Sequence, residues 1–186
     1  MAIPASKNGL LPPYDGEDAQ IDCSSPFPAT TLELCQKFGR TPQRREILKG
    51  FLRFRALFHQ LGVTEGFQWV DGRFLEEDGD AGAGPDYIDV VTFCKDPPLI
   101  DEPRFDEISA PLRADFDAIR KDFHVVGVLV SLDWPASEII KQTGFYGSLY
   151  SHQQGTGIWK GMLEIQLATT KEDARAMEHL NTSEGT

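Results

Sequence analysis

The sequence contains few cysteines, no long hydrophobic run and no excess of basic residues, and each shortage excludes a class of protein. Its three cysteines (Cys23, Cys35 and Cys94) are widely spaced, which argues against a disulfide framework or a zinc cluster and favours a reducing cytoplasm. No apolar run reaches the roughly 18 residues that a membrane span needs. The first residues, MAIPAS, lack the charged and apolar regions of a signal peptide. We therefore expect no membrane partner.

Basic residues are outnumbered by acidic ones. With 18 Lys and Arg against 29 Asp and Glu, the chain has a formal net charge of −11 when His is neutral. This balance argues against nucleic-acid binding, which needs a basic face to displace counterions from phosphates. The 186 residues include 40% hydrophobic and 10% aromatic residues, enough for a hydrophobic core. We expect an acidic, cytoplasmic protein with one folded domain.

The N-terminal segment differs in composition from the rest of the chain. Residues 1–28 are rich in Pro, Gly, Asp and Ser, which disfavours regular structure. We expect an extended arm over 1–28 that packs on the body and a single domain over 29–186, with a loose tail as the alternative for the arm. The apolar residues expected to dock are Ile3, Leu10, Leu11, Tyr14 and Phe27.

Helix signals are clear at several places in the remainder. Thr30 and Glu33 have the spacing of a capping box before a short helix that ends at Gly39. Thr41-Pro42 begins a longer helix that ends at Gly62. Further helices are expected at 109–123, at 170–180 and at 137–150, the last broken near its two glycines, Gly144 and Gly147.

Strand signals alternate with these helices. Strands are expected at 67–70, 88–93, 124–132 and 158–167. The run 124–132 (HVVGVLVSL) is the longest β-branched stretch and the best candidate for a buried central strand. The order of elements predicts an α/β (α+β) fold with a small mixed β-sheet flanked by helices.

Charge is distributed unevenly along the chain. Residues 71–107 hold twelve acidic and three basic residues, whereas 36–60 hold seven basic residues and one acidic residue. One interpretation of each cluster is a charged surface of the protein that faces solvent. The functional alternative is an acidic, metal-holding loop beside a basic helix that faces phosphate.

Several segments, taken in order, resemble a known superfamily. The segments are NGLLPP at 8–13, GFQWVDG at 66–72, GPDYIDVV at 84–91, IDVVTF at 88–93 and WKGML at 159–163. The chain resembles the nucleotidyltransferase superfamily of the DNA polymerase β type, and more closely a bacterial branch of small nucleotidyltransferase-like proteins. The resemblance covers most of the chain. It implies a small mixed sheet with a Gly-Ser turn, an Asp-x-Asp pair on the next strand and a third carboxylate on a later strand.

That pattern serves a chemical need. Nucleotidyl transfer uses two divalent cations between the triphosphate and the attacking hydroxyl. Mg²⁺ prefers carboxylate and phosphate oxygens, and residues two apart on a strand share one face of the sheet. The glycine turn lets backbone and hydroxyl groups approach the phosphates.

This sequence departs from the pattern at most of these positions. Gly72 matches the turn glycine, but Arg73 stands at the serine position. Asp89 matches the second aspartate, whereas Tyr87 stands at the first. Asp86 lies three residues before Asp89, so only a bulge or a strand start brings the two carboxylates together.

The third carboxylate is also absent from its expected place. The resemblance puts it near Val126, in a run with no acidic residue before Asp133. Asp89 alone offers one charge where two metals need several, and Arg73 repels a cation but suits an anion. We therefore expect a catalytically degenerate protein with no cofactor, which acts by binding or regulation through a cleft around Gly72, Arg73, Tyr87 and Asp89.

The alternative is an active enzyme. Asp86 and Asp89, with an acid from 76–80 or Glu164, would then rebuild a metal site. Such an enzyme would transfer a nucleotide to a protein or small-molecule hydroxyl with Mg²⁺. A further hypothesis is an interaction scaffold whose own N-terminal arm fills the cleft. The expected partner of a degenerate protein is another protein or a small anionic ligand or nucleotide.

Residues near the C-terminal strand leave two interpretations open. Lys160 either meets a phosphate or is a lysine at a strand edge, and Gly161 either allows close backbone approach or marks a bulge. An aromatic cluster nearby either stacks on a base or belongs to the core. The members of this cluster are Tyr146, Tyr150, His152 and Trp159.

Overall fold

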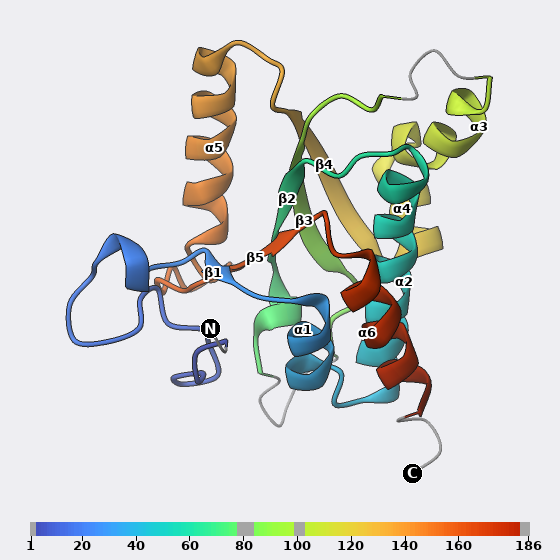
Figure 1. Ribbon diagram of the computed structural model, residues 1–186. Helices are drawn as coiled ribbons and strands as arrows, with labels where there is room; N and C mark the ends of the chain where they lie inside the picture. The colour runs from blue at the N-terminus through green and yellow to red at the C-terminus, as the bar shows by residue number, and fades with distance from the viewer. Residues whose placement is uncertain (1–2, 78–83, 99–102, 183–186) are drawn as a thin grey trace.

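The computed structural model describes residues 3–77, 84–98 and 103–182, and its fold is mixed α/β (Figure 1). This confirms the predicted fold class. Five strands form one sheet in the order β1-β5-β2-β3-β4. The strands are β1 (Phe27–Pro28), β2 (Gly66–Asp71), β3 (Ile88–Cys94), β4 (Val125–Ser131) and β5 (Leu163–Gln166).

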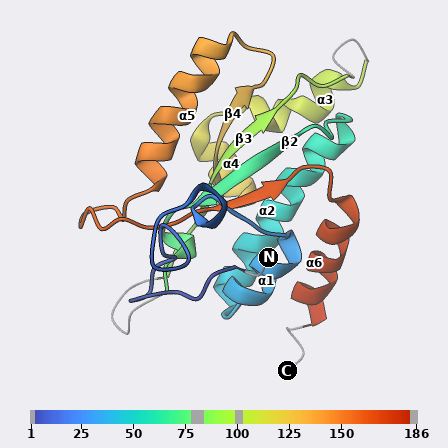
Figure 2. The ribbon, with the colours of Figure 1, turned by 60° about the vertical axis from the view of Figure 1, so that its left-hand side comes forward.

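The helices cover the two faces of this sheet unequally. The α-helices are α1 (Thr31–Phe38), α2 (Pro42–Gln60), α3 (Phe105–Ser109), α4 (Phe116–Phe123), α5 (Ala136–Tyr150) and α6 (Thr170–Thr182). Figures 1 and 2 show α2, α4 and α6 on one side of the sheet and α5 alone on the other. The larger core joins α1, α2 and α6 to one face of the sheet, and a smaller aromatic cluster lies on the face towards α5. Within the described residues, no helix is both long and apolar enough to cross a membrane.

The first two helices begin and end where their capping residues predict. The Thr30 side chain accepts a hydrogen bond from the Glu33 amide (3.1 Å), and the Glu33 carboxylate accepts one from the Thr30 amide (2.8 Å). Gly39 is the C-cap of α1, and Thr41 is the N-cap of α2. An N-cap of this kind stabilises a helix by about 1 kcal/mol.

Three predictions about local structure are wrong. The run 124–132 forms β4, which lies at an edge of the sheet and leaves Leu129 46% exposed, so it is not a central strand. Residues 136–150 form one continuous helix, because a glycine in a helix costs only about 1 kcal/mol relative to alanine. The helix expected at 109–123 is instead two helices, α3 and α4, joined by a 3₁₀ turn (Ala110–Arg113), with Asp115 as the N-cap of α4.

Strand register positions the residues of interest. Strands β2 and β3 are antiparallel, and their pairing places Asp71 directly opposite Asp89. Strands β3 and β4 are parallel, and Asp89 pairs with Val126. Side chains directly opposite on adjacent strands share a face and have Cβ atoms about 5 Å apart. The two aspartates therefore lie together at one end of the sheet.

The N-terminal segment packs against the body, as its apolar residues predict. Leu10 and Leu11 are buried, and Phe27 lies in β1, which pairs with β5. The Gly161 amide donates a 2.8 Å hydrogen bond to the Leu11 carbonyl, and a Cβ at Gly161 would overlap the Pro12 carbonyl oxygen. Gly161 therefore allows close approach of two backbone segments, which was one of its two interpretations.

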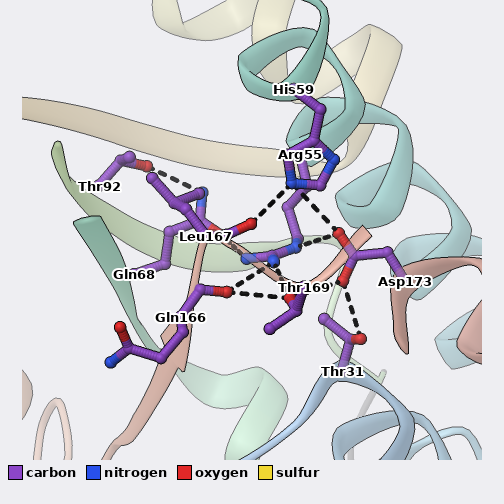
Figure 3. Close-up of polar contacts among 9 residues, drawn as sticks. All are labelled: Thr31, Arg55, His59, Gln68, Thr92, Gln166, Leu167, Thr169 and Asp173. Atoms are coloured by element: carbon purple, nitrogen blue, oxygen red, sulfur yellow. Dashed lines mark hydrogen bonds and ion pairs between the residues drawn. The ribbon is translucent and has the colours of Figure 1, made fainter. Parts of the chain in front are cut away.

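A buried polar network joins the sheet to α2 and α6 (Figure 3). Arg55 of α2 is fully buried, and its Nε donates to the Asp173 carboxylate at 2.9 Å. Its other nitrogens donate to the Gln68 side chain (2.6 Å), the Gln166 carbonyl (2.9 Å) and the Thr169 hydroxyl (2.8 Å). The Asp173 carboxylate also accepts a hydrogen bond from Thr31. This arrangement, which we call the Arg55 network, fixes the C-terminal helix to the core.

Candidate functional site

A cavity of about 350 Å³ opens beside the paired aspartates of β2 and β3. We call it the aspartate cavity. Its walls come from the end of β2, the start of β3, the end of α5 and the segment that leads to β5. The lining residues that carry its chemistry are Asp71, Gly72, Arg73, Glu76, Tyr87, Asp89, Tyr150, His152, Gln153 and Lys160.

The centre of the cavity is an ion pair that the sequence analysis did not identify. Asp71 is the last residue of β2, and Lys160 lies just before β5. The Lys160 ammonium donates a short hydrogen bond to Asp71 Oδ1, and each side chain is only 4% exposed. The backbone of Lys160 is fixed by a 2.8 Å hydrogen bond from its amide to the Ser151 carbonyl. Lys160 is therefore a buried counter-ion and not a lysine at an exposed strand edge.

Burial changes the acidity of both aspartates. It raises the pKa of Asp71 to about 7, although the Lys160 ammonium acts in the opposite direction. Burial raises the pKa of Asp89 to about 6, again against the charges of Lys160 and Arg120. Burial and these two carboxylates also raise the pKa of the Tyr150 hydroxyl. Titratable groups with shifted pKa values that share a cavity are typical of functional sites.

The turn after β2 requires glycine. Gly72 has a φ of 83°, and a Cβ there would overlap the carboxylate of Asp89. The next residue, Arg73, is exposed and begins a short 3₁₀ helix (Arg73–Leu75). The glycine therefore allows Asp89 to lie against the backbone, while the arginine stands at the rim of the cavity.

Arg120 of α4 lies next to the other side of the cavity. Its guanidinium is 4.5 Å from the ring centroid of Tyr87 and 4.0 Å from the Asp86 carboxylate. Asp86 is 71% exposed and is not one of the residues that line the aspartate cavity. Tyr87 therefore presents an aromatic wall that is fixed by a cation–π contact.

The remaining wall is polar. Gln153 donates a 2.9 Å hydrogen bond to Glu76, and this contact joins the turn after β2 to the turn after α5. His152 is exposed and contacts the Ser151 hydroxyl at 2.9 Å through Nδ1. Of the expected aromatic cluster, Tyr150 is buried, whereas Trp159 is 54% exposed.

A comparison with protein families covers most of the chain. Residues 3–166 match the model of a family of unknown function, DUF6932. The chain belongs to DUF6932. No curated protein and no solved structure matches it. The DUF6932 match includes every residue that lines the aspartate cavity, whereas Asp173 of the Arg55 network lies beyond it.

The donor atoms of the cavity do not fit the two-metal site that the nucleotidyltransferase resemblance implies. Asp71 and Asp89 face each other, but Lys160 already binds Asp71. Val126, near which the resemblance puts the third carboxylate, pairs with Asp89 across the sheet and bears no acidic group. Over the described residues, no three His, Cys, Asp or Glu side chains are grouped closely enough to hold a metal ion.

The other acids considered for a metal site are dispersed. Glu164 accepts hydrogen bonds from Trp69 (3.4 Å) and Gln166 (3.0 Å) and is not a lining residue of the aspartate cavity. Of the two described residues in this acidic stretch, Glu76 lines the cavity, whereas Glu77 does not and pairs with Arg40 at 3.4 Å. Residues 78–80 of the stretch lie outside the described residues.

Seven of the residues singled out from the sequence line the aspartate cavity. Five belong to the expected cleft or phosphate contact (Gly72, Arg73, Tyr87, Asp89 and Lys160), and two, Tyr150 and His152, belong to the expected aromatic cluster. Asp71 and Arg120 were missed. A signal for Asp71 was present, because both strands flanking the acidic loop have an aspartate at the end nearest that loop, and antiparallel pairing places two such residues together.

Proposed function

We propose that this DUF6932 protein is a catalytically degenerate, nucleotidyltransferase-like protein of the cytoplasm that binds a small anionic ligand in the aspartate cavity without a metal. One observation carries the proposal: the ammonium of Lys160 lies against Asp71 in the cavity that Asp89 also lines. A fixed protein cation thus supplies positive charge at the carboxylates, where the related chemistry would need a metal ion.

The rim of the cavity supports an anionic ligand. Arg73 is exposed at the rim, and a guanidinium binds phosphate or carboxylate groups through two parallel hydrogen bonds. Tyr87 offers an aromatic face, and His152 and Gln153 offer hydrogen-bonding groups. Because burial raises the pKa values of Asp71 and Asp89, their repulsion of an anion is weaker than that of two fully ionised carboxylates.

The test is calorimetry and thermal shift with ATP, GTP, CTP and UTP, each with and without Mg²⁺. We expect binding of at least one nucleotide that does not depend on metal and that Arg73→Ala abolishes. Arg175→Ala is the matched control, because Arg175 is an exposed arginine (63%) on α6. Binding that is equal in wild type and Arg73→Ala would contradict the proposal.

A second candidate function rests on the pairing of the two aspartates. Asp71 and Asp89 are directly opposite in the register of β2 and β3, so two carboxylates do converge in one cavity. This favours residual Mg²⁺-dependent nucleotidyl transfer to a protein or small-molecule hydroxyl. In the same experiment, this alternative predicts binding only with Mg²⁺ and its loss in Asp89→Ala.

The surface of α5 supports association with another protein. Only Tyr150 among its fifteen residues is buried, while Ile140 (71%), Phe145 (60%) and Leu149 (55%) are exposed. Phe145 and Leu149 are four residues apart and therefore lie on one side of the helix. Exposed large apolar side chains that lie together commonly mark protein interaction sites. We expect amine-directed cross-linking in cells to join Lys141 of α5 to a partner protein. Phe145→Ser should reduce these cross-links and Phe116→Ser, an equally exposed phenylalanine on α4 (58%), should not. Unchanged cross-links in Phe145→Ser would contradict this role.

A further inference from the structure

One carboxylate of the aspartate cavity has no hydrogen-bond donor. Asp89 lines the cavity, and within the described residues its carboxylate accepts no hydrogen bond and forms no ion pair. The other two acidic side chains of the cavity are engaged. Asp71 is paired with the Lys160 ammonium. The Glu76 carboxylate accepts a hydrogen bond from Gln153 at 2.9 Å. Asp89 is therefore the acceptor in this cavity that is most available to a ligand.

A tyrosine hydroxyl in the same cavity also has no partner. Tyr150 lines the cavity and is only 7% exposed, and its hydroxyl makes no hydrogen bond in the part of the chain that the structure describes. The hydroxyl oxygen is not sealed from solvent, so a molecule in the cavity can reach it. Burial raises the pKa of this hydroxyl, and the charges of Asp89 and Asp71 raise it further, so it is neutral at pH 7 and lies near both carboxylates. A nearly buried hydroxyl without a partner calls for a bound molecule as an explanation.

The charge of the cavity does not suit a ligand that is only anionic. Three acidic and two basic side chains line the cavity. Burial raises the pKa of Asp89 to about 6, so this carboxyl is still mostly ionised at pH 7. Arg120 is a further cation near Asp89, but its guanidinium already lies 4.0 Å from the Asp86 carboxylate. An anionic group at Arg73 is thus repelled by Asp89, and a positive group on the same ligand would offset this repulsion.

The two recognition groups are close enough for one small molecule. Gly72 directly precedes Arg73, and a Cβ at Gly72 would overlap the Asp89 carboxylate. The backbone that carries Arg73 therefore lies beside Asp89, and the arginine side chain alone determines how far apart the two charges are. A cavity of about 350 Å³ is in the range of small-molecule sites.

We propose that the anionic ligand of the aspartate cavity also carries a primary ammonium group, which donates hydrogen bonds to the Asp89 carboxylate and the Tyr150 hydroxyl while the anionic group binds Arg73. The ligand is thus a small zwitterion, such as an amino acid or a phosphorylated amino alcohol. An ammonium group has three donors, enough for both acceptors. This inference rests on the proposed function, because it retains anion binding at Arg73 and adds a second recognition group.

The test compares O-phosphoethanolamine with ethyl phosphate, which lacks only the amino group, by NMR titration of the full-length chain at pH 7 without divalent metal. We expect O-phosphoethanolamine to bind about 10–100-fold more tightly, the gain from a hydrogen bond between charged groups. Asp89→Asn should remove most of this preference, because it weakens O-phosphoethanolamine and leaves ethyl phosphate bound equally or more tightly. Asp117→Asn, an exposed aspartate on α4 outside the cavity, is the control and should change neither affinity.

A second variant tests the hydroxyl. Tyr150→Phe should weaken O-phosphoethanolamine by about 3–10-fold, the loss of one neutral hydrogen bond, and leave ethyl phosphate unchanged. Neither Asp89→Asn nor Tyr150→Phe should prevent folding, because neither removes a hydrogen bond between described residues. Thermal unfolding of both variants without ligand verifies this.

The outcomes separate this inference from the function on which it rests. Equal affinities for the two probes, both weakened in Arg73→Ala, overturn the ammonium site and leave anion binding at Arg73 intact. A preference for O-phosphoethanolamine that Asp89→Asn retains also overturns the ammonium site alone. Binding of neither probe at millimolar concentration, or ethyl phosphate binding that is equal in wild type and Arg73→Ala, overturns both.

Discussion

Two ion pairs are buried within the described part of the chain, Arg55–Asp173 and Asp71–Lys160, and they differ in how many hydrogen bonds their atoms make. In the Arg55 network, the guanidinium donates to four acceptors, which lie in β2, in β5, in α6 and in the turn between β5 and α6. The Asp173 carboxylate accepts from more than one donor (Figure 3). In the aspartate cavity, the Lys160 ammonium makes one hydrogen bond to a side chain among the described residues, to Asp71, and a second carboxylate stands beside the pair.

This difference suggests different roles: the Arg55–Asp173 pair stabilises the fold, whereas the Asp71–Lys160 pair has unused hydrogen-bonding capacity for the ligand that we propose. A buried charge is tolerated when hydrogen bonds replace the water it has lost. Arg55 has that full set, so it contributes to the attachment of α6 and leaves nothing for a ligand. Lys160 and Asp71 keep free donor and acceptor capacity that faces a cavity of about 350 Å³.

The largest expected effect comes from breaking the satisfied pair. Arg55→Met removes the donor to Asp173, Gln68 and the Gln166 carbonyl at once, and it should lower the free energy of unfolding by about 3–5 kcal/mol. Urea denaturation measures this loss. Arg175→Met, at an exposed position of α6, should change stability by less than about 0.5 kcal/mol. A loss below about 1 kcal/mol in Arg55→Met would show that the network is not structural.

The pH dependence of the free energy of unfolding tests the aspartate cavity in the same comparison. The pKa values of Asp71 (about 7) and Asp89 (about 6) lie above the ordinary value near 3.9, so the folded protein binds more protons than the unfolded chain between these limits. Stability contributed by these groups is present below about pH 4 and is lost as the pH rises to about 7. In Asp89→Asn, the loss of unfolding free energy between pH 4 and pH 7 should be smaller than in wild type by about 2–3 kcal/mol. Urea unfolding of both proteins at pH 4, 5, 6 and 7 measures this difference. Parallel curves for the two proteins would contradict the raised pKa.

Breaking the cavity pair should cost less than breaking the Arg55 network. Lys160→Met leaves Asp71 without its counter-ion, but that carboxyl can take up a proton because burial already raises its pKa to about 7. We expect a loss of about 1–2 kcal/mol at pH 7 by urea denaturation. Adding Asp71→Asn to Lys160→Met should recover part of it, and a double variant less stable than Lys160→Met would exclude this explanation.

The smallest effect on stability is expected at the rim. Arg73 is exposed, so Arg73→Ala should change the free energy of unfolding by no more than about 0.5 kcal/mol, although it abolishes ligand binding in our proposal. Thermal unfolding without ligand provides the measurement. A large loss of stability would indicate that Arg73 supports the fold rather than a ligand.

Local signals in the sequence were sufficient for much of the fold. Thr30, Glu33 and Thr41 act through residues only three positions away, and the helices that they cap begin as predicted. The position of β4 at the sheet edge depends instead on which strands pair across the whole chain. A β-branched run indicates a strand but does not show how many neighbours the strand has.

The candidate site was also predictable only where local sequence patterns define it. Gly72 and Asp89 stand in segments that resemble a known pattern, and both line the cavity. The Asp71–Lys160 pair joins residues separated by 89 positions, and neither residue type nor local spacing indicates that they meet. Asp86 was a candidate metal ligand because it is close to Asp89 in the sequence. The residue opposite Asp89 on the neighbouring strand is instead Asp71.

The contact at Gly161 links the beginning of the chain to the chemistry of the cavity. The Leu11 carbonyl holds the amide of the residue that directly follows Lys160, and the absence of a side chain at Gly161 lets the Pro12 carbonyl press against it. The arm supplies no wall of the aspartate cavity among the described residues, but it anchors the backbone from which the lysine extends. Proteolytic removal of this segment, or a bulky N-terminal fusion tag that displaces it, would therefore make the Lys160 ammonium less firmly positioned in the aspartate cavity without altering any residue that lines the cavity.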